Sequence, residues 1–278
     1  MDWSKAKPVL FLLRKCTIII TLILALIHLI HALTLDRIIE YNEVPFTSPR
    51  WPEALDGYRI AFISDTHNIS ARRLQSVVDE LNNREIDMLL IGGDLWAHYE
   101  RVLDSLAGIE TTDGIFGVEG NHDCHVRLFT AMEGHGMVPL SNSGQQIRKG
   151  FWLAGVEDLW NRRACIATAI KDAENDDFVL LLSHNPDVTN RQCTTGVDLV
   201  VSGHTHAGQI RFLGLWAPFF TFTNIITNYG QRFVSGWATS RDGVPVYVSN
   251  GTGNVVPRVF ARPQVIIFTM HSKCVLNP

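Results

Sequence analysis

Histidine, aspartate and asparagine side chains follow five separate apolar runs of the sequence. The plainest case is the run 200–206, VVSGHTH, in which two histidines spaced i, i+2 come directly after a glycine. Neutral imidazole is the commonest metal ligand in proteins, so the pair could bind one metal each or share one. Taken alone, the pattern is equally compatible with a loop that exposes two histidines. The other four runs favour metal binding.

The four other runs end in Asp65-Thr66-His67, Gly93-Asp94, Gly120-Asn121-His122-Asp123 and Ser183-His184. Together with His204 and His206 they form a set of oxygen and nitrogen ligands without sulfur. Such a set suits Mn, Fe, Zn or Co better than a thiolate zinc site or an all-oxygen Ca or Mg cage. Seven ligands are too many for one tetrahedral ion. They suit two divalent ions that share a carboxylate and keep positions open for water and substrate.

The elements that must position these residues form an alternating α/β pattern. Buried strands are predicted over residues 58–64, 86–91, 114–119, 178–182, 197–202, 244–249 and 265–270. Helices are predicted over 70–83, 99–106, 126–134 and 162–173, and short antiparallel strands over 138–140, 145–149 and 151–156. Ligands of open α/β sheets bind beyond the carboxyl ends of the strands, so we expect the five endings to meet in one cleft.

The order and spacing of these five blocks resemble the signature of the calcineurin-like metallophosphoesterases, over about residues 59–270. Segments 203–209 and 249–253 make the chain most similar to the membrane-associated bacterial branch, which includes enzymes like the UDP-2,3-diacylglucosamine hydrolases. The resemblance implies an α/β fold, a four-layer α/β/β/α sandwich of two mixed sheets. It also implies a hydrolase that acts on phosphoric ester bonds.

The resemblance further implies a role for each residue of the blocks. The first metal would be held by Asp65, His67 and His206. The second would be held by Asn121, His184 and His204, with Asp94 as the bridge. His122 would donate to the phosphate or leaving-group oxygen and Asp123 would orient its ring, although Asp123 also suits a helix N-cap. Arg258 is a candidate for substrate contact.

Elementary chemistry is consistent with these roles. Two ions about 3.5–4 Å apart clamp a phosphoryl group, neutralise its oxygens and lower the pKa of a water, so that hydroxide is available near neutral pH. A carboxylate can bridge because each of its oxygens can bind one cation. Protonation of the leaving oxygen requires a group that titrates near neutral pH, for which a histidine such as His122 is suited.

The composition limits the class of protein. The chain has 278 residues, of which 46% are apolar, enough for one large domain and an appendage. A net charge of -4 provides no basic field for a polynucleotide, so we expect no nucleic-acid partner. No obligate protein partner is evident. The five cysteines form no CxxC pair, which indicates neither a disulfide framework nor a thiolate zinc site.

The appendage is predicted to be a transmembrane helix over residues 16–35, a stretch without formal charge that is long enough to cross a bilayer. Four basic residues lie within 1–15 and acidic residues follow the stretch, so residues 1–15 are expected in the cytoplasm and the catalytic domain outside the cell membrane. A cleaved signal peptide is the competing interpretation. The apolar stretch is longer than a usual signal-peptide core, and no A-x-A site follows it. A buried core helix is a further alternative.

Residues 36–56 contain three prolines and no periodicity, so they are predicted to be a tether, with the metallophosphoesterase domain over 57–278. The aromatic segment 212–222 is either a loop packed into the core or an apolar lip that dips into the membrane or holds an acyl chain.

The expected substrate is a phosphodiester, pyrophosphate or phosphomonoester, and an anchored enzyme favours a lipid-linked one. The alternative function is a non-catalytic metal-binding scaffold, which would have no reason to retain His122.

Overall fold

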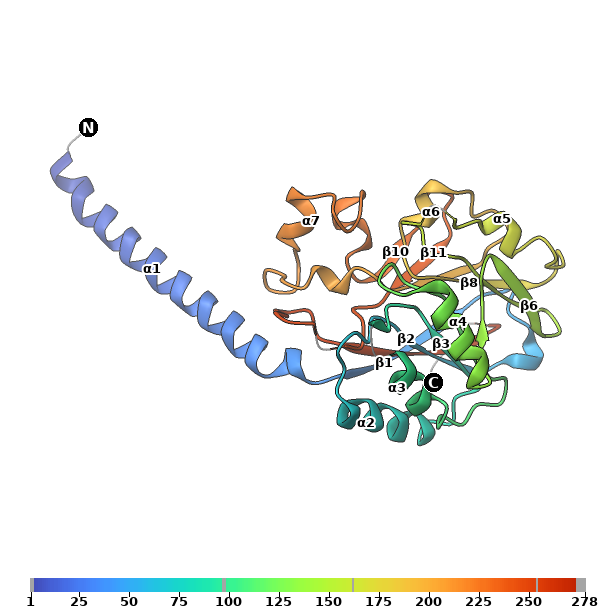
Figure 1. Cartoon of the computed structure of the whole chain (residues 1–278). Helices are drawn as coiled ribbons and strands as arrows, with labels where there is room; N and C mark the ends of the chain where they lie inside the picture. Colours follow the sequence, from blue (N-terminus) through green and yellow to red (C-terminus); the bar gives the residue numbers. More distant parts are fainter. Residues whose placement is uncertain (1–2, 97–98, 162, 254, 274–278) are drawn as a thin grey trace.

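Two six-stranded mixed sheets pack face to face in the computed structural model, which describes residues 3–96, 99–161, 163–253 and 255–273 (Figure 1). The first sheet contains β1 (Glu40–Thr47), β2 (Tyr58–Ile63), β3 (Met88–Ile91), β4 (Ile115–Gly117), β5 (Val138–Pro139) and β12 (Gln264–His271). Its order is β1-β12-β2-β3-β4-β5, and β2 to β5 run parallel. β12 lies antiparallel to β2.

The second sheet has the order β10-β11-β9-β8-β7-β6. Its strands are β6 (Ser143–Arg148), β7 (Phe151–Gly155), β8 (Phe178–Ser183), β9 (Leu199–Ser202), β10 (Gly236–Thr239) and β11 (Pro245–Val248). β7, β8, β9 and β11 are parallel, and the edge strands β6 and β10 are antiparallel to their neighbours. The carboxyl ends of β8 and β9 therefore point the same way.

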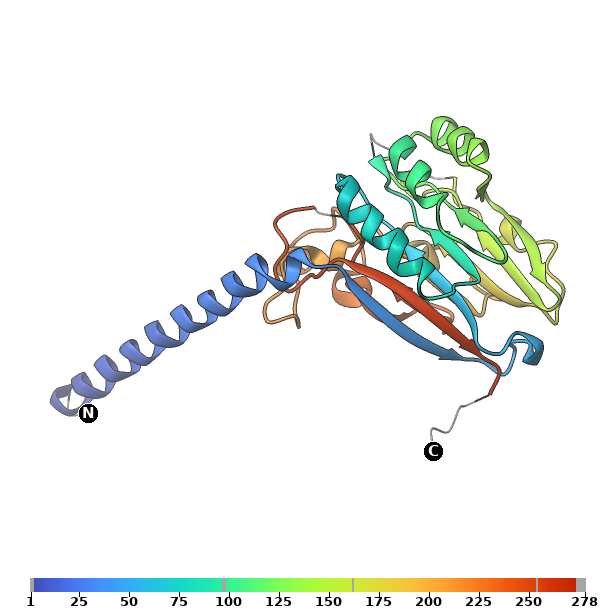
Figure 2. The same ribbon diagram turned by 90° about the horizontal axis from the view of Figure 1, so that it is seen from below.

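The central strands are apolar along their whole length because both faces of each sheet are covered. In β2, Ile60 and Phe62 face the second sheet, whereas Ala61 and Ile63 face the outer helices. The outer helices of the first sheet are α2 (Ala71–Asn82), α3 (Tyr99–Leu106) and α4 (His125–Gly134). Figure 2 shows these helices along one side of the molecule. The predicted four-layer α/β/β/α sandwich is confirmed.

The outer layer of the second sheet is thinner than predicted. Among the residues that the structure describes, it contains two four-residue helices, α5 (Ile166–Ala169) and α6 (Val188–Arg191), with the 3-10 turn η5 (Gly230–Phe233) beside them. The prediction of a helix over 162–173 is therefore wrong for most of its described residues. β5 was also expected to be antiparallel, but it pairs parallel with β4.

The segment predicted to be a tether is part of the fold. Residues 40–47 form β1, which pairs in parallel with all eight residues of β12. Downstream, Trp51 is 2% exposed and packs against Phe151 and Phe178 between the sheets. Upstream, the carboxylate of buried Asp36 accepts the backbone N–H groups of 260 and 261. The tether prediction is wrong over these residues because three prolines are compatible with an edge strand and its turns.

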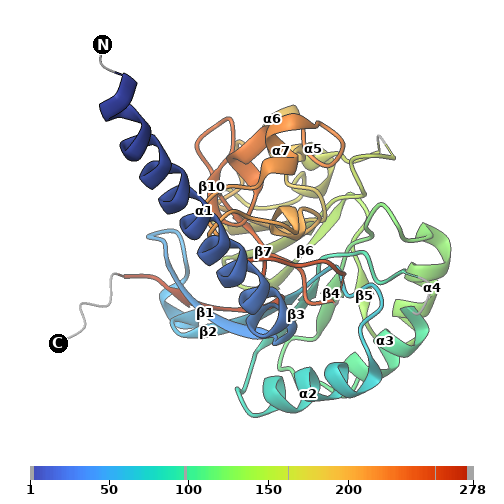
Figure 3. The same ribbon diagram turned by 90° about the vertical axis from the view of Figure 1, so that its left-hand side faces the viewer.

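α1 (Trp3–Leu33) is a single 31-residue helix that projects from the domain (Figure 1) and extends toward the viewer in Figure 3. It begins within the segment predicted to be a separate basic N-terminus, 1–15, of which residues 1–2 lie outside the described range. One stretch, Pro8–Arg37, is long and apolar enough to cross a membrane, with a mean hydropathy of 2.5 and none of its most apolar window buried. Such a helix is compatible with a membrane anchor or a signal sequence.

The last turns of α1 contact the domain. His28 Nδ1 donates to the carbonyl of Leu24 at 2.7 Å, which leaves Nε2 to accept the backbone N–H of Leu213 at 3.2 Å. The ring of His31 stacks on Phe260 with a centroid distance of 3.9 Å. The two histidines of the apolar segment therefore join the helix to the domain.

Candidate metal centre

The structure brings all seven predicted metal ligands together at the carboxyl ends of five strands. Three of the loops follow β2, β3 and β4 of the first sheet, and the other two follow β8 and β9 of the second. The ligands fall into two neighbouring groups. One contains Asp65, His67 and His206, and the other contains Asn121, His184 and His204. Asp94 lies between the two groups.

The backbone of these loops is unusual because five of the seven residues are non-glycine residues with positive φ. They are Asp65 (52°), His67 (38°), Asp94 (56°), His204 (72°) and His206 (50°). This conformation costs on the order of 1–3 kcal/mol for each residue and persists only where the surroundings impose it. It turns each side chain sharply inward where the strand ends. Strain of this kind concentrates at functional sites.

Two glycines make room for the carboxylates. A Cβ atom added at Gly120 would lie 2.1 Å from Asp94 Oδ1, and one added at Gly203 would lie 2.4 Å from Asp65 Oδ2. Asp65 in turn accepts the backbone N–H of His204 at 3.0 Å. The glycines that precede Asn121 and His204 in the sequence are therefore required by the close approach of the two carboxylates.

In the group of Asn121, His184 and His204, hydrogen bonds define the imidazole tautomers. His184 Nδ1 donates to the carbonyl of Gly92 at 2.7 Å, and His204 Nε2 donates to the carbonyl of Ile226 at 3.0 Å. The other ring nitrogens, His184 Nε2 and His204 Nδ1, are therefore unprotonated. They face each other inside the group and are 3.1 Å apart. Asn121 Oδ1 is also 3.1 Å from His184 Nε2. Three acceptors that converge in this way require a cation or a proton among them.

A proton is the simplest occupant. Burial lowers the pKa of His184, but the charges of Asp94, Asp65 and Asp158 outweigh that effect and raise the pKa to about 9. Burial also raises the pKa of Asp94 to about 7. Protons and divalent cations therefore compete for the same lone pairs.

In the group of Asp65, His67 and His206, the two histidines are held neutral. Their Nε2 atoms are 3.1 Å apart, and His206 Nε2 is 3.5 Å from Asp65 Oδ1. Burial lowers the pKa of His67 to about 4 and that of His206 to about 3. Neutral imidazole is the form that binds metals. Asp65 stays ionised because the nearby histidines lower its pKa despite its burial.

Asp94 is shared by both groups. Its Oδ2 atom is 3.7 Å from His67 Nε2 and 3.6 Å from His184 Nε2. Asp65, His67, Asp94 and His206 offer ligand atoms that all lie within 4.8 Å of one another. A cation with bonds of about 2.1 Å places neighbouring ligand atoms roughly 3.0–3.4 Å apart in octahedral or tetrahedral geometry. The observed separations of 3.1–3.7 Å fit such a cation after small movements.

His122 lies at the edge of this centre with an exposed side chain. Its backbone N–H donates to Asp94 Oδ1 at 2.9 Å. Its ring packs against Trp96, with a centroid distance of 4.6 Å, and lies 5.9 Å from the ring of His67. Sequence reasoning missed Trp96, which follows Asp94 by two residues and is the aromatic neighbour that positions His122. The one available signal was an aromatic residue directly after a ligand block.

Asp123 binds the backbone of two ligand loops in this structure. Its Oδ1 accepts the backbone N–H groups of Leu95 and Trp96, at 2.9 and 3.1 Å. Its Oδ2 accepts those of Asp94 and Gly120, at 2.7 and 2.9 Å. Both oxygens are thus used by backbone donors, and the orientation of the His122 ring by Asp123 stays a prediction. Asp123 joins the loop after β3 to the loop after β4 and so fixes the backbone of Asp94.

Arg258 also binds the backbone. Its side chain is buried, with 3% of the residue exposed, and its guanidinium donates to the carbonyls of Asn250, Ala261 and Gly253. Burial lowers its pKa to about 10. The guanidinium therefore holds together the backbone of residues 250–261, and a contact of Arg258 with substrate stays a prediction.

A second aromatic side chain that the sequence analysis missed borders the centre. Trp160 is 47% exposed, and its ring lies edge-on to His204 with a centroid distance of 5.2 Å. Trp96 is 40% exposed. The two tryptophans flank opposite ligand groups, so each can contact a substrate that reaches the metals. Trp160 lies far from any ligand block in the sequence, which is why no local pattern identified it.

The fold and the ligand cluster define a class of protein that the sequence comparisons identify. Residues 58–208 match the calcineurin-like phosphoesterase family, and the chain belongs to that family. It is 31% identical over 231 residues to the uncharacterized protein YpbG of Bacillus subtilis, and the aligned region covers 76% of this chain and 80% of that protein.

Other relatives are longer than this chain. The chain is 29% identical over 226 residues to an uncharacterized metallophosphoesterase of Helicobacter pylori, covering 76% of the chain and 58% of that protein. It is 27% identical over 276 residues to the transmembrane protein with metallophosphoesterase domain of Danio rerio, covering 89% of the chain and 60% of that protein. These names identify no particular branch of the superfamily.

Proposed function

We propose that the chain is a dinuclear-metal phosphoesterase, anchored to a membrane by α1. The observation that carries the proposal is the position of Asp94 Oδ2, which lies 3.7 Å from His67 Nε2 and 3.6 Å from His184 Nε2. One carboxylate thus belongs to two groups of nitrogen and oxygen ligands. The reaction is hydrolysis of a phosphodiester, pyrophosphate or phosphomonoester.

The first ion would be held by Asp65, His67, His206 and Asp94, and the second by Asn121, His184, His204 and Asp94. The donor set suits Mn, Fe, Zn or Co. Two such ions neutralise phosphoryl oxygens and lower the pKa of water, which makes hydroxide available near neutral pH. The chain itself contributes the fixed tautomers of the histidines and the clamp that Asp123 places on the ligand loops.

His122 is the residue that would donate a proton to the leaving oxygen. In the hydrolysis, water gives up one proton to solvent, its oxygen forms a bond to phosphorus, the bond from phosphorus to the leaving oxygen breaks, and the leaving oxygen takes the proton of His122. Because the His122 side chain is exposed, it can regain a proton from solvent. Trp96 keeps the ring beside the centre.

The contacts between α1 and the domain support the anchor. A segment that is cleaved off would not be expected to hydrogen-bond the folded domain, as His28 does with Leu213.

The distribution of basic residues favours an extracytoplasmic domain. That orientation favours, as substrates, phosphoesters at the outer surface of the cell membrane, including lipid-linked ones, over a nucleotide-activated precursor in the cytoplasm. In intact cells, a membrane-impermeant maleimide should label the exposed Cys193; labelling only after lysis contradicts the orientation.

The activity is tested with the full chain and bis-p-nitrophenyl phosphate in the presence of Mn. We expect hydrolysis that a chelator abolishes and that Asp94→Ala reduces by at least about 100-fold, because each ligand group loses its shared carboxylate. Asp104→Ala is the matched control, since Asp104 is exposed on α3. Activity that survives both the chelator and Asp94→Ala contradicts the proposal. Bound Mn without hydrolysis of any phosphoester favours the metal-binding scaffold.

A further inference from the structure

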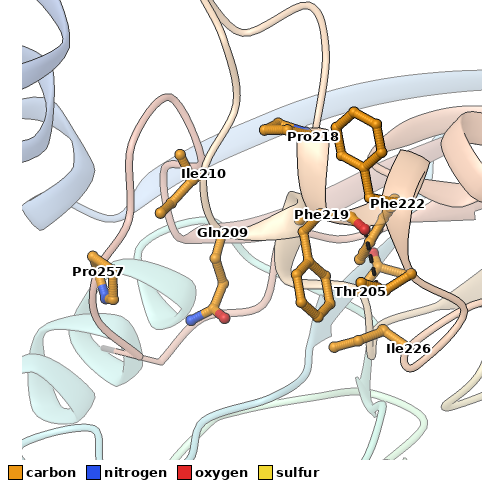
Figure 4. Close-up of a pocket in the computed structure, with 11 residues that line it drawn as sticks. Thr205, Gln209, Ile210, Pro218, Phe219, Phe222, Ile226 and Pro257 are labelled. Atoms are coloured by element: carbon orange, nitrogen blue, oxygen red, sulfur yellow. Dashed lines mark hydrogen bonds between the residues drawn. The ribbon is translucent and has the colours of Figure 1, made fainter. Parts of the chain in front are cut away.

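A cavity of about 510 Å³ lies beneath the short helix α7 (Pro218–Phe222), in the segment that follows the last two histidine ligands. Its wall includes Gln209, Ile210, Phe219, Phe222, Thr223 and Ile226. Figure 4 shows the ring of Phe219 lying between Gln209 and Ile226. The volume is typical of a small-molecule site, and the described residues that line it include no charged side chain.

The cavity shares a wall with the candidate metal centre. Thr205, which lies between the ligands His204 and His206 in the sequence, lines the cavity. Ile226 also lines it, and the carbonyl of Ile226 accepts the hydrogen bond from His204 Nε2 at 3.0 Å. Thr205 and Ile226 thus place the cavity next to the candidate metal centre.

The chain around the cavity carries apolar side chains that solvent reaches. Phe222, which lines the cavity, is 76% exposed. Leu215 and Ile225, which precede and follow α7 in the sequence, are 83% and 65% exposed. Exposed apolar side chains that gather in one place indicate contact with a membrane or another apolar partner. The same segment meets α1, because Leu213 donates to His28, and Figure 1 shows α7 at the end of the domain nearest α1. The exposed apolar side chains near the cavity therefore lie in the segment that contacts α1, the helix that is long and apolar enough to cross a membrane.

We propose that this cavity binds the hydrocarbon tail of a membrane lipid whose phosphoester is hydrolysed at the metal centre. The assignment rests on the proposed function and adds the site that recognises the lipid portion. The occupant is a hydrocarbon chain because the wall is apolar, exposed apolar side chains lie near it on the side of α1, and Thr205 and Ile226 of its wall adjoin the ligands. The helix α7 is then the entrance rather than a core loop.

The test uses alkyl p-nitrophenyl phosphates that share one reacting group and differ only in chain length, from ethyl to octyl. The full chain is assayed in nanodiscs with Mn. Each methylene that enters the cavity raises kcat/KM by up to about fourfold, so we expect the octyl ester to exceed the ethyl ester at least tenfold. Thr223→Trp should bring this ratio close to one, because the new side chain fills the cavity.

Leu215→Trp is the matched control, since it adds the same side chain at an exposed position that does not line the cavity. It should keep the octyl-to-ethyl ratio of the parent chain. Phe219→Ser removes part of the wall instead of filling the space and should also lower the ratio, which provides a second variant if Thr223→Trp does not fold. Equal ratios in the parent and Thr223→Trp overturn the assignment, as do equal losses in Thr223→Trp and Leu215→Trp.

Failure of the proposed function has a different signature. If even the ethyl ester is not hydrolysed, the phosphoesterase proposal fails, and the cavity is judged by calorimetric binding of octylphosphonate and ethylphosphonate. At least tenfold tighter binding of octylphosphonate, lost in Thr223→Trp and retained in Leu215→Trp, supports the tail site. Equal binding of the two phosphonates overturns it.

Discussion

Replacing Asp123 by asparagine separates two roles for this residue. The carboxylate accepts four backbone N–H groups, at 2.7, 2.9, 2.9 and 3.1 Å. Asparagine retains one oxygen and presents an N–H₂ group in place of the other, so two of the four backbone donors lose their acceptor. Hydrogen bonds to a charged group contribute about 1.5–3 kcal/mol each, so the loss is about 3–6 kcal/mol in the free energy of unfolding.

That loss is large for a domain whose total stability is about 5–15 kcal/mol. The Tm of Asp123→Asn should be lower by roughly 6 °C or more, because each kcal/mol of lost stability lowers the Tm of a domain of this size by about 2 °C or more. Because the released N–H groups include that of Asp94, Mn affinity measured by calorimetry should fall as well. His122→Gln is the control, since its exposed side chain makes little contribution to stability. Unchanged Tm and Mn affinity with a lower kcat would refute the clamp and restore Asp123 as the residue that orients His122.

Three further predictions concern the centre and the fold. Gly120→Ala should lower kcat by about 100-fold, because the new Cβ must displace the Asp94 carboxylate by roughly 1 Å; Gly134→Ala, which has nothing within 4 Å, should not. Mn added to chelator-treated protein at pH 7 should release protons and bind more tightly as the pH rises from 7 to 9, because the raised pKa of His184 keeps it protonated below about pH 9; calorimetry in buffers of different ionisation enthalpy measures this release. Trp51→Ala should lower the free energy of unfolding by about 3–5 kcal/mol in urea titrations, because this side chain fills the space between the sheets; an unchanged midpoint contradicts it.

The sequence predicted the ligand cluster well because each ligand follows a strand that is apolar on both faces. Such runs are visible in a single sequence, and the carboxyl ends of parallel strands meet at one edge. The close approach of Asp94 to both His67 and His184 is the physical outcome of that rule. The two-sheet architecture was predicted through the family resemblance, since the pairing order of strands leaves no local pattern.

The errors share one cause: they involve interactions between residues far apart in the chain. β1 was missed because its partner, β12, lies more than two hundred residues later, and an edge strand with a proline has no clear alternation. The backbone hydrogen bonds of Asp123 and Arg258 were not predicted, because the sequence does not show whether a charged residue binds substrate or backbone. Trp160 was missed because only tertiary structure brings it to His204.

The short connection between α1 and β1 limits how far the domain can move away from α1. α1 ends at Leu33 and β1 begins at Glu40, so the six residues 34–39 span at most about 20 Å when fully extended. Asp36, within that connection, is itself buried. If α1 spans a bilayer, this connection would keep the domain from swinging freely and would hold it close to the lipid headgroups. Phosphoesters carried by lipids would then come to the domain by lateral diffusion.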